Sequence, residues 1–303
     1  MLYNTESLTA QVALVTCAEV PELDSDTRLL VDPLAALGIS AVPAVWDDPN
    51  IDWSVFDLAV VRSPWDYLHR RAEFLAWANR VPRLANPADI LEWNTDKRYL
   101  QELAGSSVPV VPTVWLQPDQ QWRSPEQGEW VIKPAVSLAS LDTGRYRLDD
   151  PGQRRLAVDH VRRLQQAGRT VMVQPYLAGV DTEGETSLVY VGGAFSHAIR
   201  RGPVLDGPDT GIDRRFQHDW EHDLRERQPA TSQLALAEQV LAAVPGGPER
   251  LLYARVDLLP GPDGAPVLIE IELTEPVLFL GHAPGATERF AAAIAARVSS
   301  ALV

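Results

Sequence analysis

Hydrophobic and polar positions alternate between two periods along the first third of the chain. Three short apolar runs have the length and composition of buried strands, at residues 12–16, 41–46 and 58–62. Two further stretches, 26–37 and 70–79, have the apolar spacing of helices. Strands that alternate with helices predict a parallel sheet with helices on its faces. We therefore expect an α/β domain over residues 1–93, on the substrate side of the molecule.

The pattern changes in the remaining two thirds, where strands and helices no longer alternate regularly. Apolar runs predict strands at 130–134, 171–174, 185–192, 194–200, 251–259 and 265–273. Helical spacing predicts helices at 94–104, 151–168, 231–244 and 287–303. Between these elements, 203–219 is a Gly/Pro/Asp-rich loop, which is either mobile or an active-site cover. We expect two α+β lobes, over 94–176 and 177–303.

Carboxylates lie along the last predicted hairpin, whose strands are joined by the turn 260–264. Residues two apart in a strand share a face, so Glu270 and Glu272 point the same way. Asp257, on the neighbouring strand, can join them. Three carboxylates on an apolar hairpin repel one another, and a hard cation such as Mg²⁺ relieves that repulsion. The alternative is a solvated polar face.

Two loops follow predicted strands of the N-terminal domain, at the sheet edge where ligands of parallel sheets bind. One runs from Cys17 to Asp26 and the other from residue 62 to residue 67. Their cation, hydroxyl, carboxylates and phenol suit a small polar substrate. The alternative is a turn in which Pro64 ends the strand and Trp65 packs on the core. The candidate substrate residues are Asp24, Arg62, Ser63, Asp66 and Tyr67.

Composition narrows the class of partner. The net charge of −14 argues against a nucleic-acid partner, which needs a basic face. No apolar stretch reaches the length of a membrane span, and residues 1–11 lack the pattern of a signal peptide. The single cysteine, Cys17, fits a reducing compartment. We expect a cytoplasmic protein that acts on a small molecule, as a monomer or a homodimer.

Lysines are few, and two of them are placed where a nucleotide could bind. Lys133 ends a predicted strand and precedes a loop of small and hydroxylic residues, which includes Ser137 and Ser140. Such a loop can present backbone N–H groups and hydroxyls to phosphate oxygens, and the lysine adds a positive charge. Lys97 could close over the nucleotide from the other side. The chain has neither a P-loop nor a Rossmann glycine motif.

The order of these parts resembles the ATP-grasp carboxylate–amine ligases over about residues 86–281. Glu270-Ile-Glu272-Leu-Thr-Glu275-Pro276 is similar to the family's Glu-x-Asn-x-x-x-Pro motif, with Glu272 in place of the usual Asn. Arg255-Val-Asp257 matches the family's Arg-x-Asp. The resemblance implies an ATP-grasp fold, in which an N-terminal β/α domain precedes two α+β lobes that enclose ATP. It also implies one or two Mg²⁺ ions, or Mn²⁺ in their place.

The resemblance implies a role for each candidate residue. Asp257, Glu270 and Glu272 would bind the metal, and Arg255 would face the transferred phosphoryl group. Arg201 falls near an arginine that stabilises the acyl phosphate, and Arg200 is an equal candidate. The remaining residues would bind ATP: Lys97, Lys133, Ser137 and Ser140 at the phosphates, Gln174, Pro175, Tyr176 and Leu177 at adenine, and Glu185 at the ribose.

Within the family, three segments look most like the group that contains the O-ureido-serine cyclo-ligase of D-cycloserine biosynthesis. These segments are Arg62–Tyr67, Trp93–Lys97 and Glu270–Pro276. The resemblance implies that a small amino-acid-like carboxylate is activated as an acyl phosphate and attacked by a nitrogen of the same molecule. Two alternatives stay open: an intermolecular ligase that joins an amino acid to a second amine, and a nucleotide-binding module without turnover.

Overall fold

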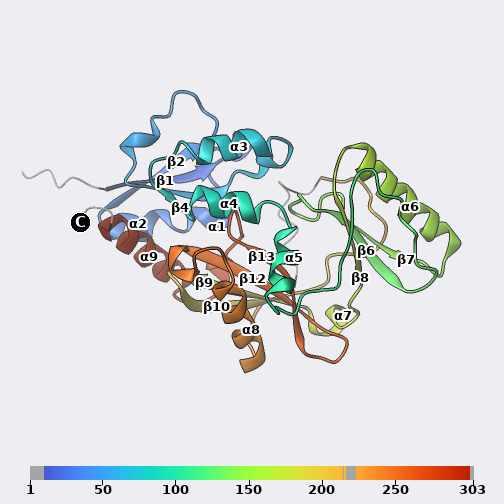
Figure 1. Cartoon of the computed structure of the whole chain (residues 1–303). Coiled ribbons are helices and arrows are strands. Elements are labelled where there is room, and N and C mark those ends of the chain that lie inside the picture. Colours follow the sequence, from blue (N-terminus) through green and yellow to red (C-terminus); the bar gives the residue numbers. More distant parts are fainter. Residues whose placement is uncertain (1–9, 214, 216–222, 301–303) are drawn as a thin grey trace, which may run out of the picture.

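The computed structural model describes residues 10–213, 215 and 223–300. Within these residues the chain forms three separate β-sheets (Figure 1). Residues 1–9, part of the predicted loop (214 and 216–219) and the end of the last predicted helix (301–303) lie outside the described residues. Figure 1 shows the N-terminal sheet (blue) and the central lobe (green) toward opposite ends of the molecule. The C-terminal lobe (orange) lies against both of them.

The N-terminal sheet has the order β2-β1-β3-β4 and is parallel throughout. Its strands are β1 (Ala10–Thr16), β2 (Ile39–Val45), β3 (Leu58–Ser63) and β4 (Leu84–Ala85). Alternate residues of β1 enter different cores: Val12 and Leu14 pack with the C-terminal lobe, whereas Ala13 and Val15 pack with the Trp-rich opposite face. Burial on both faces explains why these strands are continuous apolar runs.

Short helices cover this sheet: α1 (Ser25–Arg28), α2 (Val31–Ala36), α3 (Arg71–Ala78), α4 (Ala88–Asn94), and the 3-10 turns η1 (Trp53–Val55) and η2 (Trp65–His69). The prediction of one helix over 26–37 was wrong. Pro33 has no backbone N–H to continue a helix that begins at Ser25, so the chain forms two helices instead.

The central lobe is a four-stranded antiparallel sheet of order β5-β8-β6-β7, with a helix on one face. Its strands are β5 (Val114–Leu116), β6 (Glu129–Pro134), β7 (Gly144–Arg147) and β8 (Val171–Pro175), and its helix is α6 (Pro151–Gln166). The Asp150 side chain caps α6 by accepting from two backbone N–H groups. Strand β7 was not predicted, because it is short and lies beside the loop of small residues.

The C-terminal lobe is a five-stranded antiparallel sheet of order β11-β10-β9-β12-β13. Its strands are β9 (Glu185–Val191), β10 (Ala194–Arg201), β11 (Arg225–Glu226), β12 (Tyr253–Pro260) and β13 (Pro266–Glu272). Helices α5 (Tyr99–Gly105) and α8 (Thr231–Ala242) pack on one face, and α9 (Ala286–Ser300) packs on the other. The shorter elements are α7 (Val180–Glu183), η4 (Pro248–Arg250) and η5 (Leu280–His282). Both predicted hairpins are confirmed.

Buried polar side chains join the N-terminal domain to the C-terminal lobe. Asn86 donates to the carbonyls of Tyr253 and Leu273 and accepts from the Leu252 N–H. Asn94, the first residue of the helix predicted over 94–104, instead ends α4. Its side chain binds the backbone of Ile271 in β13 and of Leu273 just after it. Each sheet lies inside one of the three predicted ranges, but these contacts and α9 tie the first range to the last.

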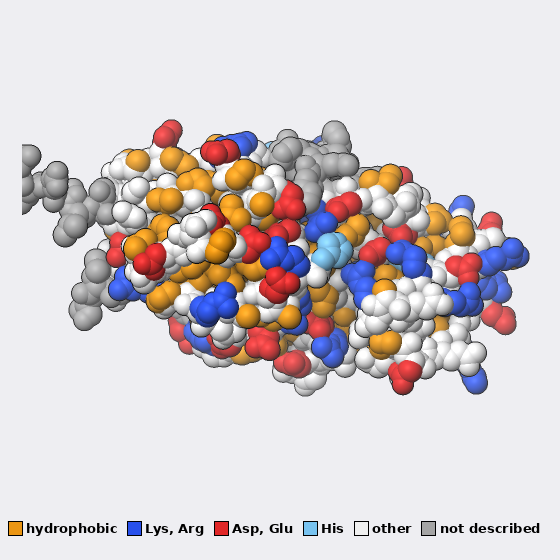
Figure 2. Space-filling model, turned by 90° about the horizontal axis from the view of Figure 1, so that it is seen from above, with side chains coloured by type: hydrophobic (Ala, Val, Ile, Leu, Met, Phe, Trp, Pro, Cys, Tyr) orange, Lys and Arg blue, Asp and Glu red, His pale blue; other side chains and the backbone are white. Residues whose placement is uncertain are grey.

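Surface charge and helix length add two observations. On the face seen in Figure 2, Lys and Arg side chains are interspersed with Asp and Glu side chains, so that face has no continuous basic surface for a nucleic acid. Within the described ranges, every helix is too short or too polar to cross a bilayer.

Candidate active site

A cavity of about 300 Å³ lies between the sheets of the central and C-terminal lobes. Strands β6 and β8 supply one wall and β12 and β13 supply the other. Trp65 of the N-terminal domain also lines the cavity. Fourteen of the predicted site residues line it, and twelve of these are the predicted nucleotide and metal residues: Lys97, Lys133, Ser137, Ser140, Gln174, Pro175, Tyr176, Leu177, Glu185, Asp257, Glu270 and Glu272. Arg201 and Arg255 line it as well.

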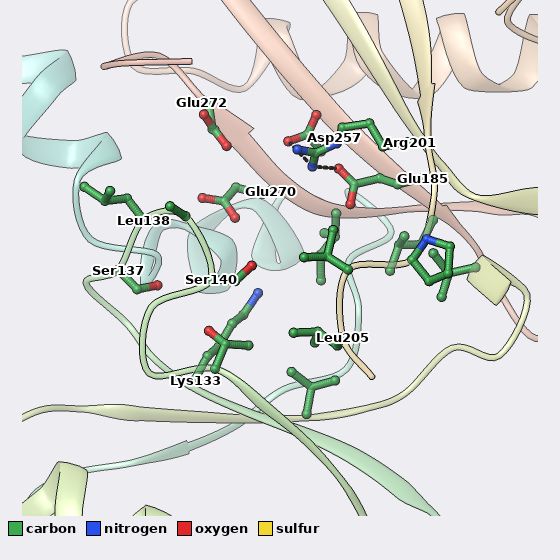
Figure 3. A pocket seen from close by; sticks show the side chains of 18 of the residues that line it. Lys133, Ser137, Leu138, Ser140, Glu185, Arg201, Leu205, Asp257, Glu270 and Glu272 are labelled. Atoms are coloured by element: carbon green, nitrogen blue, oxygen red, sulfur yellow. Dashed lines mark hydrogen bonds and ion pairs between the residues drawn. The ribbon is translucent and has the colours of Figure 1, made fainter. Parts of the chain in front are cut away.

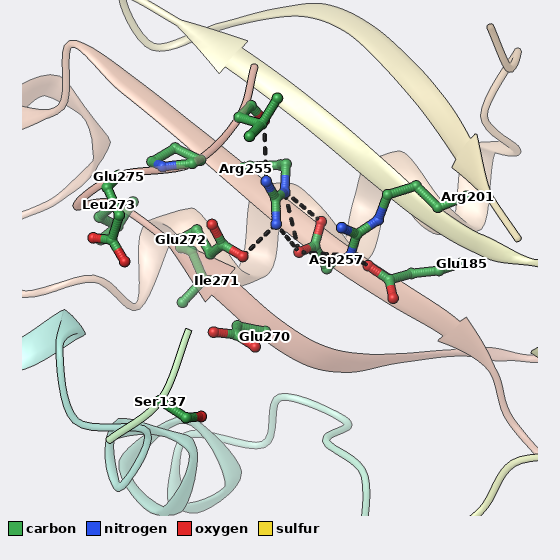
Figure 4. Close-up of polar contacts among 12 residues, drawn as sticks. Ser137, Glu185, Arg201, Arg255, Asp257, Glu270, Ile271, Glu272, Leu273 and Glu275 are labelled. Carbon is green, nitrogen blue, oxygen red and sulfur yellow. Dashed lines mark hydrogen bonds and ion pairs between the residues drawn. The ribbon is translucent and has the colours of Figure 1, made fainter. Parts of the chain in front are cut away.

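The acidic side chains form a row along the C-terminal lobe (Figure 4). In the antiparallel register, Asp257 lies opposite Glu270 and Arg255 lies opposite Glu272. Directly opposed residues share a face of the sheet, so all four side chains face the cavity. The pleat of two neighbouring strands is therefore sufficient to gather them.

Arg255 connects the members of this row. Its guanidinium donates to both oxygens of Asp257, at 2.8–3.1 Å, and also to Glu272. A further N–H donates to the Val277 carbonyl at 3.0 Å. Burial raises the pKa of Asp257, but Arg255 and Arg201 outweigh it, and the pKa ends below its usual value. Asp257 is thus ionised across the ordinary pH range.

Glu272 lies in a more negative environment. Burial raises its pKa to about 8, Arg255 opposes that shift, and the charges of Glu270 and Asp257 add to it. A divalent cation among these carboxylates would stabilise their ionised forms. Carboxylate oxygens are also the ligands that Mg²⁺ prefers, so the donor set of Asp257, Glu270 and Glu272 fits a magnesium ion.

The three carboxylates do not form a closed ligand set by themselves, because Arg255 and Lys97 pair with them. Among the described residues, one group of metal-ligating side chains has donor atoms that all lie within 4.8 Å of one another. It consists of Cys17, Glu19 and Asp66. That cluster is a poor metal site, since burial raises the pKa of the Cys17 thiol to about 11 and only the thiolate is a good ligand. The acidic row is the better candidate.

Two buried lysines face the acidic row. The Lys97 ammonium pairs with Glu270 at 2.9 Å and donates to the Ser137 carbonyl at 2.7 Å. Lys133 rises from the end of β6 into the cavity (Figure 3). Burial lowers the pKa of Lys133 to about 8, Glu270 opposes this, and the charge of Lys97 adds to it. A polyanion bound between the lysines would relieve their repulsion.

Glu185 and Arg201 form an ion pair at the other end of the row (Figure 4). Arg201 also lies 3.7 Å from Asp257. Arg200, the alternative to Arg201, does not line the cavity: its guanidinium binds Asp223 at 2.6 Å and the Glu183 carbonyl at 3.0 Å. Alternation along β10 directs one arginine inward and the other away.

The segment from Gln174 to Leu177 crosses from the central lobe to the C-terminal lobe along the cavity. The Gln174 side chain donates to Thr113 at 2.9 Å. Arg145 lies over the Tyr176 ring, 3.5 Å from its centroid, and fixes the outer side of the segment. Leu177, together with Val131 and Leu259, gives this end an apolar lining that suits a flat aromatic base.

The loop of small residues after Lys133 forms the floor of the cavity. Ala139 and Ser140 have φ of 49° and 54°, a left-handed backbone that glycine adopts more easily. Asp142, which has φ of 54°, is held from outside by Arg163 and Arg169. These ion pairs maintain a conformation that the absence of glycine would otherwise disfavour.

A second loop, 203–213, covers the cavity from the opposite side. Val204 and Leu205 line the cavity, and the Asp209 side chain pairs with Arg163 of α6. The Arg145 N–H donates to the Gly207 carbonyl at 2.8 Å. The predicted Gly/Pro/Asp-rich loop therefore forms part of the site, and it bridges the two lobes.

Comparison with known proteins identifies the family. Residues 12–86 match the model of the N-terminal domain of the D-cycloserine synthetase DcsG. The whole chain is 38% identical, over 301 residues, to the cycloserine biosynthesis protein DcsG of Streptomyces lavendulae. That match covers 95% of this chain and 98% of the relative. The chain belongs to the ATP-grasp ligases, in the family of DcsG.

Solved structures agree. The crystal structure of D-cycloserine synthetase DcsG superposes with a TM-score of 0.81 at 35% identity, covering 95% of this chain and 100% of that one. The ATP-grasp ligase PsnB, complexed with a minimal precursor, Mg and ADP, superposes with a TM-score of 0.59 at 15% identity, covering 95% and 98%. The expected ATP-grasp fold is confirmed, and the chain is a ligase that forms a carbon–nitrogen bond.

None of the five predicted substrate residues of this ATP-grasp chain lines the cavity. Asp24 caps α1, and the Ser63 hydroxyl bonds to that of Thr16. Asp66 accepts from the Trp46 indole. Arg62 donates to the Pro276 carbonyl at 2.7 Å and lies beside the Tyr253 and Phe290 rings. In this conformation these side chains hold the fold, because each has a polar partner of its own and all but the half-buried Asp66 are buried.

The fifth candidate, Tyr67, reaches the site through another residue. Its hydroxyl donates to Glu275, which lines the cavity. Sequence reasoning did not select Glu275, although it lies in the same motif as Glu270 and Glu272. It also missed Trp65 and Arg215 as lining residues; the Arg215 guanidinium donates to the Trp65 carbonyl at 2.9 Å. No pattern in the loop around Arg215 marks it.

Proposed function

We propose that this ligase activates a small amino-acid-like carboxylate as an acyl phosphate, at the expense of ATP converted to ADP. A nitrogen of the same molecule then attacks the activated carbon. The substrate that we propose is O-ureido-D-serine and the product is D-cycloserine, with the carbamoyl group hydrolysed to CO₂ and ammonia. The observation that carries this proposal is the 38% identity to DcsG across 95% of the chain.

The cavity offers each group that the first step needs. Leu177 and the apolar lining beside it would hold adenine, Glu185 would accept from the ribose hydroxyls, and Lys97 and Lys133 would bind the phosphates. Asp257, Glu270 and Glu272 would hold Mg²⁺, which when bound neutralises phosphate charge. Phosphoryl transfer depends mainly on such positioning and charge neutralisation.

The second step depends on stabilising and shielding the acyl phosphate. Arg255 and Arg201 project guanidinium groups into the cavity, where they would bind the phosphoryl oxygens of the intermediate. The apolar side chains of Trp65, Leu205 and Phe279 line the same space. They would exclude water, which otherwise hydrolyses an acyl phosphate.

An intermolecular ligase of the same fold is the alternative. The two are distinguished by phosphate release with Mg²⁺ and ATP across a panel of small carboxylates that includes O-ureido-D-serine. We expect O-ureido-D-serine alone to stimulate release and to yield D-cycloserine, detected by mass spectrometry. Release only when a second amine is added would reject the cyclisation. Binding of ATP without release under any acid or amine would reject the ligase mechanism.

A further inference from the structure

Glu275 occupies the end of the acidic row that is farthest from Glu185 (Figure 4). It follows β13, in the turn that leads to Pro276, and its carboxylate lines the cavity. Tyr67, which is 3% exposed, donates its hydroxyl to Glu275 Oε1 at 2.9 Å. Glu275 therefore lies where the N-terminal domain and the C-terminal lobe meet.

One oxygen of Glu275 has no partner. Oε2 is shielded from solvent and accepts no hydrogen bond from any residue of the described chain. Burial of a carboxylate oxygen without a hydrogen-bond donor costs free energy. Such oxygens are therefore rare in folded proteins unless a ligand supplies the donor. The Tyr67 hydroxyl fixes the orientation of the carboxylate and leaves Oε2 to accept from a ligand.

The chemical nature of the group that would donate to Glu275 Oε2 follows from the groups that each ligand carries. The phosphate groups of ATP are acceptors and offer no N–H group to Oε2. The adenine amine and the ribose hydroxyls are donors, but the proposed function places adenine beside Leu177 and the ribose at Glu185. Glu185 lies at the opposite end of the row from Glu275 (Figure 4). The donor at Glu275 therefore comes from the second ligand of the cavity, the substrate whose carboxylate is activated.

The charges around Glu275 favour a positively charged donor group on the substrate over a neutral one. Burial raises the pKa of Glu275 to about 7, and the Tyr67 hydrogen bond and the charge of Lys97 oppose this shift. An ammonium group paired with Oε2 would hold the carboxylate in its ionised form. Trp65, two residues before Tyr67, and Val277, two residues after Glu275, also line the cavity. Their apolar surface lowers the local dielectric, which strengthens such a pair.

We propose that Glu275, oriented by Tyr67, binds the ammonium group of the amino-acid substrate and so selects substrates that carry an amino group beside the carboxylate to be activated. This inference rests on the proposed function, because it assumes that the carboxylate of such a substrate lies near Arg255 and Lys97. Glu275 is a binding and specificity residue in this scheme, and it takes no part in phosphoryl transfer.

The test is an equilibrium binding experiment that needs no turnover. Calorimetry with Mg²⁺ and a non-hydrolysable ATP analogue would compare O-ureido-D-serine with the analogue that has hydrogen in place of the amino group. We expect the wild type to prefer the amino compound by at least about thirtyfold. Glu275→Gln should reduce the preference to about threefold or less, and Tyr67→Phe should give an intermediate value.

Controls separate this role from others. Glu288→Gln, an exposed site in the first turn of α9, should leave the preference unchanged. Affinity for the ATP analogue should be the same in Glu275→Gln as in the wild type. An unchanged preference in Glu275→Gln, or no preference in the wild type, would overturn the inference. Equal weakening of ATP-analogue binding would also overturn it, by assigning Glu275 to the nucleotide or metal. Failure of the proposed function appears separately, as absent phosphate release in the wild type.

Discussion

Lys133 should make ATP binding depend on pH in a way that its replacement by arginine removes. Lys133 lies near the end of β6, and the residue is 8% exposed. Burial and Lys97 lower its pKa to about 8 against the opposing charge of Glu270. Phosphate oxygens bound beside it would raise that pKa again, so ATP binds most tightly when Lys133 is protonated.

The sign and size of the effect follow from this shift. Below pH 8 the free protein already carries the proton, and binding costs nothing at this group. Above pH 8 binding must take up a proton, so affinity falls by about tenfold between pH 7 and pH 9, which is about 1.4 kcal/mol. At pH 8 itself, binding should take up roughly half a proton per ATP.

Calorimetry can measure both quantities. A non-hydrolysable ATP analogue with Mg²⁺ would be titrated at pH 7, 8 and 9, in buffers of different ionisation enthalpy, into the wild type and Lys133→Arg. Arginine keeps its charge over this range, so the variant should bind without the proton uptake of the wild type. Titration of the nucleotide and of Glu272 is common to both proteins and cancels in the comparison.

The reasoning fails if the wild type and Lys133→Arg show the same change in affinity and the same proton uptake between pH 7 and pH 9. That result would mean that Lys133 is fully charged at pH 9 in the free protein, or that it does not contact the phosphates. Lower affinity of Lys133→Arg at every pH, from the larger side chain, would leave the difference in slope intact.

Three further predictions concern the metal, the arginine pair and the joint between domains. Glu270→Gln should lower phosphate release at least about a hundredfold while the melting temperature changes little; full activity would reject the metal assignment. Arg201→Ala should lower phosphate release by about a hundredfold. Arg200→Ala should lower it by about threefold or less, because Arg200 lies outside the cavity. Equal losses in the two variants would contradict this assignment. Asn86→Ala should lower the free energy of unfolding, measured in urea, by about 3 kcal/mol, because it leaves buried backbone groups unpaired. A loss below about 1 kcal/mol would show that water replaces the side chain.

Strand periodicity made much of the acidic row in the cavity predictable. The two-residue repeat of a strand places Glu270 and Glu272 on one face, and a short turn brings Asp257 beside them. The observed register, with Asp257 opposite Glu270, confirms that arrangement. Lys133 was a weaker prediction, because a lysine that ends a strand is usually solvated. Only its combination with the three carboxylates and Lys97 indicated a nucleotide site.

Other features depend on pairing between distant segments. Arg200 and Arg201 are adjacent in sequence, and only the register of β10 against β9, which sets Arg201 opposite Glu185, directs Arg201 toward the cavity. The break in the predicted helix 26–37 was predictable in principle from Pro33. The placement of Arg62 was not, because its partners are Pro276 and the Tyr253 and Phe290 rings, far away in the chain.

The sequence alone determined most of the strand and helix pattern and the acidic face of the final hairpin, because these depend on local periodicity. Tertiary structure decided which polar residues face the cavity and which hold the domains together. Glu275 shows the difference: its place in the motif was visible, but its contact with Tyr67, 208 residues away, exists only in the folded protein. Contacts across such separations follow from how the sheets pack against one another, which local patterns do not encode.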